Sequence, residues 1–501
     1  MFDFELPERF RRYVPLIAWL VVPIVLLLIP LKIVGLGFLP PDDGLRHAAK
    51  AVSGKPWPEI LVVGSNYKMD HNIGWHTFLS AVDHLTHWDA ESLLVFAIVF
   101  LFFTVNASML GWLKRPEAWL VALITAGLLS DIPGRFMLGR PYVLTILTLM
   151  TVLFAAEKSR PSAKTFLLFT AMLTMCTYFH GVWYLWLLPI AAFFFAGQFR
   201  WTFLLTGAWL IGSVLSALCT GHPVIYLSQA VDVAFSSSGQ ILSTRTVVGE
   251  LQPFSGDIVS VIAMGALVAI RMVTKPALPL VRNPAFWLVC GSWILAFRIG
   301  RFWEDWGWPA FMVLIATDIE LYMLPRIAAD SFRRLLVTCI LVLLAFMMMT
   351  SDWGTRWTST LTRPFLSEAE HPELKGWMPD NGGILYSADM ALFYRTFLKN
   401  PHANWRYQLG YEPTLMPKED FATYQKILWN YGDAKAYAPW VKKMKPADRL
   451  VIGGDSGTQP KIPELQWNYG VTGLWIGRTP RGTNSVADGT NSVSTTNSVA
   501  H

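Results

Sequence analysis

Pro40-Pro41-Asp42-Asp43-Gly44-Leu45-Arg46-His47-Ala48-Ala49 directly follows the first long apolar run of the chain, residues 14–36. Carboxylates beside hydrocarbon are costly to hold, so ionisable groups at such a place indicate a functional site by default. Asp is also a favoured N-cap residue, and this pair would equally serve to cap a helix that begins near Gly44. Residue type alone leaves both interpretations open, and the positions of the other charged residues decide between them.

The composition indicates a polytopic membrane protein. Hydrophobic residues make up 53% of the 501 positions, and they gather into more long apolar runs than a soluble chain of this length carries. The net charge of +6 is modest and reflects loop residues, so we do not expect nucleic-acid binding. Cys176, Cys219, Cys290 and Cys339 all lie in apolar runs without metal-ligand spacing, so neither a disulfide nor a zinc site is predicted.

The apolar runs predict an α-helical membrane module over residues 1–350 with about eleven spans. The expected spans lie near residues 14–36, 91–113, 117–130, 141–157, 164–180, 181–197, 201–220, 257–273, 284–298, 307–324 and 333–350. Several of these runs are shorter than the roughly 20 residues of a simple crossing. The boundaries are therefore soft, above all for the pair at 164–197.

Charge in the loops predicts the topology. Arg9, Arg11 and Arg12 precede the first run, which is too long for a signal-peptide core and is interpreted as an uncleaved anchor. With the N-terminus in the cytoplasm, every predicted cytoplasmic loop carries Lys or Arg, as the positive-inside rule requires. The first loop, 37–90, and a long loop, 221–256, then lie on the outer face together with the C-terminal region.

The two outer loops have different expected structures. Residues 37–90 are expected to form helices that lie in the membrane interface, because small apolar, charged and aromatic residues alternate there. The loop 221–256 is polar at its centre, Ser236 to Gln240, and is expected to be a mobile gate.

After about residue 351 the composition predicts a small extracytoplasmic α/β domain, residues 351–480. Expected strands lie near 383–387, 449–453 and 471–476, and expected helices near 365–378, 388–399 and 418–430. The tail 481–501 repeats Thr-Asn-Ser-Val, and this low-complexity composition predicts disorder.

The positive-inside rule disfavours arginines on the outer face, so the arginines that the predicted topology places there need an explanation. Arg135 and Arg140 lie in a Pro- and Gly-containing turn, where the plain alternative is a structural pair between Arg140 and Asp131. Arg298 and Arg301 precede an acidic and Trp-rich run, where the alternative is an aromatic belt with arginines that reach toward headgroups.

Glu304 and Asp305 follow these arginines directly, and the charges could pair within the cluster. His180 would be either a ligand-binding residue or a satisfied interfacial histidine.

Carboxylates, arginines and aromatic rings on one face suit a sugar-phosphate reaction at a membrane surface. Arginines hold phosphate bidentately, aromatic faces pack against sugars, and a carboxylate acts as the general base. We assign the base to Asp42 or Asp43, which with a histidine would alternatively hold a divalent cation such as Mg or Mn. No other cofactor is expected. The predicted substrate- and phosphate-binding residues are Arg135, Arg140, His180, Arg298, Arg301 and Glu304.

These features together resemble the C-type glycosyltransferase superfamily (GT-C). The residues that carry the resemblance are Asp42-Asp43-Gly44, followed by Ala48-Ala49-Lys50-Ala51, in a first outer loop that forms helices, with a soluble domain after the last span. The resemblance implies an inverting enzyme with a polyprenyl-phosphate-linked donor. It also implies an acidic residue of the first loop as base or metal ligand, and a bacterial inner membrane facing the periplasm.

The chain is more narrowly similar to an uncharacterised bacterial group of this architecture. An Arg-Phe-x-Glu-Tyr-x-x-Pro motif is matched by residues 301–309, with Asp305 in the aromatic position and one additional residue before the proline. A Gly-x-Asp-Pro-Thr-Phe-Met motif is matched by residues 410–416, with Glu412 and Leu415 as departures. The plain interpretation of the second motif is a turn that packs the soluble domain against the membrane module.

Three functions compete at this point. The first is transfer of a sugar from a lipid-linked donor to an extracytoplasmic glycan, lipid or protein. The second is a non-catalytic membrane subunit that keeps the fold, binds partner proteins and tolerates loss of Asp42 and Asp43. The third, a transporter, is disfavoured because the sequence has no clear internal repeat and its charges gather at one face.

Overall fold

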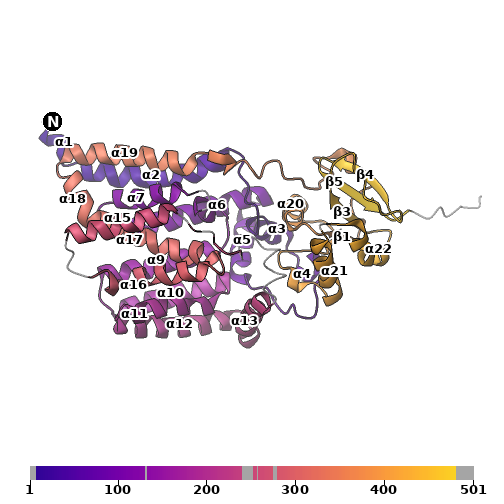
Figure 1. The fold of residues 1–501 in the computed structure, drawn as a ribbon, viewed down its shortest axis with the longest axis horizontal. Coiled ribbons are helices and arrows are strands. Elements are labelled where there is room, and N and C mark those ends of the chain that lie inside the picture. Colours follow the sequence, from indigo (N-terminus) through magenta and orange to yellow (C-terminus); the bar gives the residue numbers. More distant parts are fainter. Residues whose placement is uncertain are drawn as a thin grey trace, which may run out of the picture.

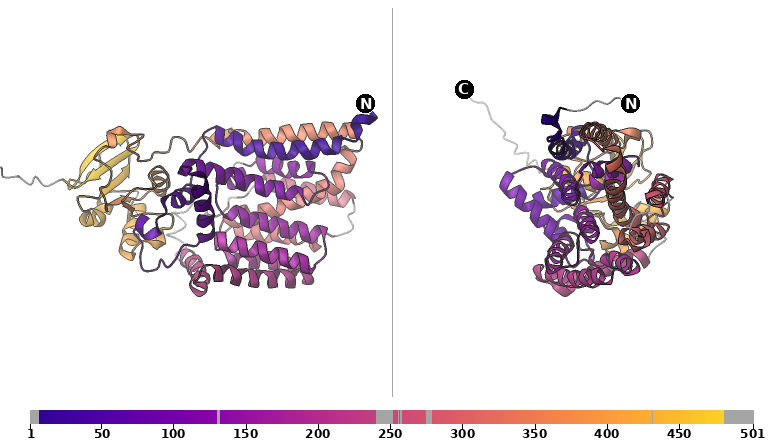
Figure 2. Two further views of the ribbon diagram at one scale, coloured as in Figure 1. Left: turned by 180° about the vertical axis from the view of Figure 1, so that it is seen from behind. Right: turned by 90° about the vertical axis from the view of Figure 1, so that its left-hand side faces the viewer.

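The computed structural model describes residues 7–129, 132–239, 252–254, 256, 258–274, 279–430 and 432–480. A long helical bundle carries a small sheet domain at one end, and α1 lies at the opposite end (Figure 1). Both views in Figure 2 show the bundle helices running along a common direction. Three predictions concern parts of the chain that the structure does not describe. They are those for Asp131, for the side chains at the centre of 221–256 and for the tail 481–501.

The bundle consists of the apolar segments of the sequence together with short helices such as the charged α1. Its helices are α1 (Glu8–Arg11), α2 (Val14–Gly35), α6 (Ala90–Leu110), α7 (Glu117–Gly127), α8 (Ile132–Phe136), α9 (Tyr142–Lys158), α10 (Ala163–His180), α11 (Leu187–Phe195), α12 (Phe199–Cys219), α15 (Ile258–Thr274), α16 (Pro284–Ala296), α17 (Trp308–Asp318), α18 (Leu324–Ile327) and α19 (Ser331–Thr350). Short π-helical turns at Trp303–Gly307 and Ile319–Met323 flank α17.

Four helices among the described residues, α2, α6, α12 and α19, are long and apolar enough to cross a membrane. Their outward faces expose large apolar side chains such as Phe203 and Leu343, as a lipid-facing surface requires. The prediction of about eleven spans is not confirmed. Helices such as α7 and α16 are apolar but, at 1.5 Å per residue, shorter than the hydrocarbon core.

The segment 37–90 folds into α3 (Gly44–Ser53), α4 (Trp57–Ile60) and α5 (Ile73–Thr86), between the bundle and the sheet domain (Figure 1). The predicted helices form, but α3 is not a surface helix with one free apolar face; its place relative to the membrane stays a prediction. Seven of its ten residues are buried, and it packs against α5, α6 and α20. Its charged side chains are accommodated inside because ion pairs and aromatic rings satisfy them, as shown below.

The segment 221–256 was expected to be a loop, and its first part is instead the helix α13 (Pro223–Gly239). Apolar residues recur there at helical spacing, and Tyr226 and Ala230 are buried. Gln229 is also buried and holds the backbone of Met69 through both amide atoms, at 3.0 and 3.2 Å. This part of the segment is therefore anchored on the loop before α5.

The C-terminal sheet has five strands in the order β2-β1-β3-β5-β4. Its elements are β1 (Ile384–Ser387), α20 (Met390–Lys399), β2 (Arg406–Tyr407), α21 (Lys418–Trp429), α22 (Ala438–Lys443), β3 (Arg449–Gly453), β4 (Gln466–Val471) and β5 (Leu474–Arg478). β1 pairs in parallel with β2 and β3, whereas β5 is antiparallel to β3 and β4.

The predicted strands near 383–387 and 449–453 are confirmed, as are the helices near 388–399 and 418–430. The predicted strand 471–476 is confirmed only in part, because it spans the turn between the end of β4 and the start of β5. The predicted helix 365–378 is wrong, since only the turn Pro372–Leu374 is helical there. Pro372 and the positive φ of Gly376 prevent a continuous helix. The pair 164–197 forms α10 and α11, which a turn after Gly181 separates.

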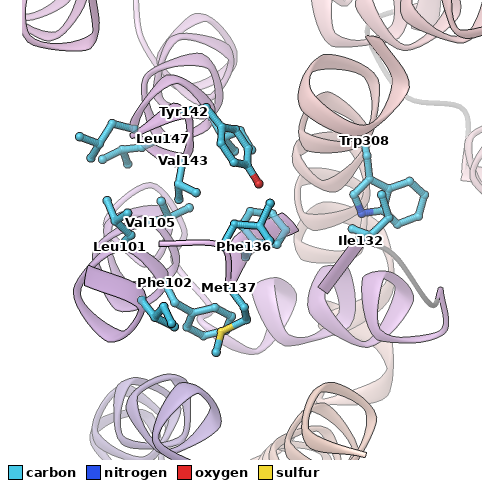
Figure 3. Close-up of a cluster of buried hydrophobic side chains, with 14 of the residues drawn as sticks. Leu101, Phe102, Val105, Ile132, Phe136, Met137, Tyr142, Val143, Leu147 and Trp308 are labelled. Atoms are coloured by element: carbon cyan, nitrogen blue, oxygen red, sulfur yellow. The ribbon is translucent and has the colours of Figure 1, made fainter. Parts of the chain in front are cut away.

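A core of buried side chains holds the turn between α7 and α9 in place. In Figure 3, Phe136 and Met137 pack toward Phe102 of α6 and Val143 of α9. The Tyr142 hydroxyl donates to the backbone carbonyl of Arg135 and closes this turn. The same core therefore fixes the positions from which two arginines reach the site.

Candidate functional site

Asp42 and Asp43 lie at the start of α3 and share one arginine from a distant segment. Arg140 donates from Nη1 to Asp42 Oδ2 and from Nη2 to Asp43 Oδ2, at 3.0 Å each. Asp131, the alternative partner expected for Arg140, lies outside the described residues. The carboxylate pair and one of the predicted phosphate-binding residues are thus brought together across 98 positions of sequence.

Asp43 does not cap α3 with its side chain. Its own backbone is helical (φ −46°, ψ −28°), and its side chain makes no capping hydrogen bond. It accepts instead from Arg46 Nε at 2.7 Å and from the Tyr394 hydroxyl at 3.0 Å. Burial alone would raise the pKa of the Asp43 carboxyl, but Arg46 and Arg140 outweigh it and hold that pKa well below its usual range.

A second cluster of charges forms around Arg135. Its Nη2 lies 2.6 Å from Asp305 Oδ1, and its Nε lies 3.3 Å from Glu304 Oε2. Arg301 donates from Nε to Asp305 Oδ2 at 2.9 Å. The alternative of pairing within the 298–308 segment is therefore confirmed for Arg301 and Asp305, and Arg135 joins that pair from outside.

Tyr142 lies between the two clusters. The guanidinium carbon of Arg135 is 4.8 Å from the centre of its ring, and that of Arg140 is 5.4 Å away. Both distances fall within the range of cation–π attraction. Figure 3 shows the Tyr142 side chain above Phe136, at the start of α9. The ring thus couples the Asp42–Asp43 pair and the Glu304–Asp305 pair into one site.

The remaining predicted residues differ in their placement. His180 ends α10, its Nδ1 lies 3.0 Å from Thr145 Oγ1, and its ring centre is 6.2 Å from that of Tyr142. It therefore borders the site, and its bond to Thr145 agrees with the plain interpretation of a satisfied histidine. Arg298 is exposed beyond the end of α16.

The sheet domain contributes residues that the sequence prediction did not assign to the site. Tyr394 of α20 binds Asp43, and the Tyr411 ring centre lies 3.8 Å from the guanidinium carbon of Arg46. Glu412 is half-buried, and burial raises the pKa of its carboxyl. The 410–416 motif also forms the expected turn against the first loop, since Gly64 N–H donates to Leu415 O at 2.7 Å.

Three further residues that the sequence prediction did not assign to the site lie beside it. Asp70 accepts from His76 Nδ1 at 2.5 Å, and His76 Nε2 lies 2.8 Å from His47 Nδ1. The available signal was His47 beside Arg46 in the segment that opens α3. The pairing itself joins α3 to α5 and has no local pattern in the sequence.

The donor set does not favour the predicted Mg or Mn site. Arg140 holds one oxygen of each carboxylate, which is where a shared cation would bind. Within the described part of the chain, no three His, Cys, Asp or Glu side chains gather as a metal-ligand group. A metal role for Asp42 and Asp43 stays a prediction, and no chemical step is derived from it.

Comparison of the chain with models of known protein families and with curated proteins finds no match.

Proposed function

We propose that the chain is an integral membrane glycosyltransferase of GT-C type that moves a sugar from a polyprenyl-phosphate-linked donor to an extracytoplasmic acceptor. One observation carries the proposal. Two carboxylate pairs and three arginines from α3, the α8–α9 turn and the turn before α17 converge around Tyr142 at one end of an apolar bundle. Cationic groups for a phosphate and a base for a hydroxyl thus meet beside the surface that faces lipid.

Arg301 and Arg135 are the proposed phosphate-binding residues. The Arg301 side chain is 31% exposed, the largest exposed fraction among the arginines of the site, and reaches the surface of the cluster. Guanidinium groups bind phosphate oxygens bidentately and stabilise the charge that develops on a departing phosphate. Glu304 and Asp305 orient these arginines through the ion pairs described above.

Asp42 is the better candidate for the general base. Its side chain is 22% exposed against 16% for Asp43, and Asp43 is held by Arg46, Arg140 and Tyr394. In the proposed step, the acceptor hydroxyl gives its proton to Asp42 while its oxygen bonds to the anomeric carbon. The bond from that carbon to the phosphate oxygen breaks, and the lipid phosphate leaves with the electron pair. Asp43 stays ionised and positions Arg46 and Arg140.

The proposed location is a cell inner membrane, with the N-terminus in the cytoplasm and the sheet domain in the periplasm. Basic residues of the predicted cytoplasmic loops support this orientation. The Arg115 backbone N–H and the Lys158 ammonium both donate to Glu320, which lies between α17 and α18, and α18 is at the bundle end remote from the sheet domain (Figure 1). The positive-inside rule assigns such an end to the cytoplasm.

Sugar transfer from a panel of polyprenyl-phosphate sugars to a glycan, lipid or protein acceptor tests the proposal. We expect Asp42→Asn to lower the rate by about 100-fold or more, the usual contribution of a general base. The matched control is Asp89→Asn, at the exposed N-cap of α6, because asparagine caps a helix as well as aspartate does. Addition and chelation of Mg or Mn in the same assay tests the metal prediction.

The alternative is a non-catalytic subunit that binds partner proteins. The mutual pairing of Arg135, Arg140 and their carboxylates is the observation that favours it, since paired charges need no substrate. Wild-type protein that neither binds nor consumes any donor of the panel, in a host that grows normally with Asp42→Asn, would establish the alternative.

A further inference from the structure

The carboxyl ends of β1 and β3 meet at a cavity in the sheet domain. β1 lies between β2 and β3 and pairs in parallel with both, so the chain leaves β1 for one neighbour and returns later to the other. In open α/β sheets, ligands bind outside the carboxyl ends of the strands at such a reversal of strand order. A cavity of about 220 Å³ lies at this point, and we call it the strand-end cavity.

One wall of the strand-end cavity is the sheet itself. Ser387 of β1 is the register partner of Val451 of β3, and both residues line the cavity. Gly453 also lines it and lies on the same face as Val451, because side chains alternate along a strand. Among the described residues, a Cβ added at Gly453 would have one neighbour within 4 Å, the carbonyl oxygen of Gly473 at 3.8 Å. Glycine therefore leaves space here that a larger residue would fill.

The other wall comes from α21 and from the helical turn Ala434–Tyr437. Ile427 and Leu428 of α21 supply apolar surface. Tyr437 is only 4% exposed, and its hydroxyl has no hydrogen-bond partner within the described residues. A Cβ added at Gly432, another lining residue, would lie 3.8 Å from that hydroxyl oxygen, which places the hydroxyl at the cavity wall. A buried hydroxyl is costly without a partner, so this one indicates a ligand.

The polar side chains of the strand-end cavity provide two hydroxyl donors and one carboxylate acceptor. Burial raises the pKa of Tyr437 to about 12, so its hydroxyl keeps the proton and can donate. Ser387 Oγ accepts from the backbone N–H of Asp389 at 3.1 Å, which leaves its own proton to donate. Asp389 Oδ1 caps α20 by accepting from the Ala391 N–H at 2.8 Å. The exposed carboxylate of Asp389 keeps its second oxygen, Oδ2, for a ligand.

This set of groups suits a neutral sugar and disfavours a phosphate. The described lining includes no Lys or Arg, and the Asp389 carboxylate would repel an anion at the start of α20, where a phosphate would otherwise bind. Sugar hydroxyls both donate and accept, so they can satisfy the carboxylate and the two hydroxyls together. The apolar face of the ring can pack on Ile427 and Leu428. The volume lies below the roughly 300 Å³ at which sites for larger organic ligands begin, so it suits a single ring.

We propose that the strand-end cavity binds one neutral monosaccharide unit of a glycan, and that the sheet domain holds the acceptor in this way. The sugar binding stands by itself, whereas the acceptor role rests on the proposed function. α20 joins the two places. It begins beside Asp389, and Tyr394, which binds Asp43, follows after five residues, about 7.5 Å along the helix axis. A glycan anchored in the cavity therefore has its next units close to the Asp42–Asp43 pair.

Titration of the full-length protein in lipid nanodiscs with methyl glycosides of neutral hexoses, followed by ligand-observed NMR, tests the binding. We expect Tyr437→Phe to weaken it by about 5-fold, because one neutral hydrogen bond is lost. Asp389→Asn should weaken it by about 10-fold, because a hydrogen bond to a charged acceptor is stronger. Asparagine caps a helix as well as aspartate does, so α20 should keep its start.

Gly453→Val tests the cavity as a space. Its side chain should fill the cavity and abolish binding, and the open surroundings of Gly453 should leave the unfolding temperature nearly unchanged. The matched control is Tyr424→Phe, because Tyr424 is buried in the same domain but is not part of the cavity lining. This control should bind the glycosides as the wild type does. The same four variants are then compared in sugar transfer to a glycan acceptor, where loss of the cavity should raise KM for the acceptor.

The outcomes separate the sugar site from the function on which its acceptor role rests. A wild type that binds none of the glycosides overturns the proposal, as does binding that Gly453→Val and Tyr437→Phe both leave unchanged. Inorganic phosphate that displaces the bound glycoside overturns it as well, because the cavity would then be an anion site. Transfer by Gly453→Val with a wild-type KM for the glycan overturns the acceptor role. Glycoside binding as expected, in a protein that transfers no sugar, supports the site and contradicts only the proposed function. Tyr437→Phe decides the binding even where Gly453→Val fails to fold.

Discussion

The two ends of the helical bundle both bury ion pairs, but they do so differently. At the end remote from the sheet domain, Asp318 accepts two hydrogen bonds of 2.8 Å from Arg271. Glu117 accepts a hydrogen bond of 2.7 Å from Arg334. Both carboxylates are only 1% exposed. Each carboxylate there has one guanidinium partner of its own in a closed environment.

At the sheet-domain end the partners are shared. Arg140 forms ion pairs with both Asp42 and Asp43, and Asp305 forms ion pairs with both Arg135 and Arg301. The carboxylates retain exposed fractions between 11% and 24%. Shared and partly exposed pairs leave donors and acceptors that a ligand can reach, whereas a closed pair offers none. The difference supports the proposed binding role of the sheet-domain end.

The largest expected effect comes from breaking a closed pair. Arg271→Met leaves Asp318 buried and unpaired, which should lower the free energy of unfolding by about 3–5 kcal/mol. Thermal unfolding in detergent measures the loss. The double variant Arg271→Met/Asp318→Leu should recover most of it, because apolar residues can replace a closed ion pair. A double variant as unstable as the single one would show that this pair has a role beyond packing.

The next effect should come from the shared arginine. Arg140→Lys keeps the charge but loses the planar fork that spans both carboxylates, so we expect sugar transfer to fall by about 10- to 100-fold, equivalent to 1.4–2.7 kcal/mol. The unfolding temperature should change little. Arg334→Lys, at the closed Glu117 pair, is the matched control, which should lower stability and leave the transfer rate unchanged. Equal effects of both variants on transfer would remove the distinction between the two ends.

A smaller effect is expected at the contact between the sheet domain and the site. Tyr394→Phe removes the hydroxyl that donates to Asp43, which should cost about 1 kcal/mol of unfolding free energy. Tyr424→Phe is the control, because Tyr424 is buried in the same domain and its hydroxyl has no hydrogen-bond partner within the described residues. Chemical unfolding of both variants measures the difference, and equal changes would argue against the Tyr394 bond.

The smallest effect should come from an ion pair that is neither closed nor shared. Lys68 and Asp232 lie 3.8 Å apart with side chains 47% and 66% exposed. Lys68→Met should change the free energy of unfolding by less than about 0.5 kcal/mol, because water and salt screen exposed charges. A measured loss above 1 kcal/mol would mean that the segment before α5 depends on this pair for its anchoring to α13.

Local patterns in the sequence predicted the individual members of the site better than their pairing. Asp42, Arg135 and Arg301 stood out because charge next to apolar runs is rare and needs compensation. The sequence did not predict that Asp42 is a partner of Arg140, because ion pairs between segments about 100 residues apart leave no periodic signal.

The fold shows the same limit. Strands β1, β3 and β5 carry apolar runs long enough to be recognised, whereas β2 has two residues and no pattern to detect. The burial of α3 was also missed, because Arg46, His47 and Lys50 suggest a polar surface. Their compensation comes from Tyr411, His76 and other side chains of distant segments.

The bond between Asp43 and Tyr394 has a consequence for biosynthesis. The two residues are 351 positions apart, and Tyr394 belongs to a domain that a ribosome makes only after the whole bundle. The Asp42–Asp43 segment is made early, and its site is complete only when the sheet domain has been made and has folded onto α3. A truncated chain would carry the carboxylates and the arginines in an open, unfinished arrangement. The architecture therefore delays completion of the site until the sheet domain has been made.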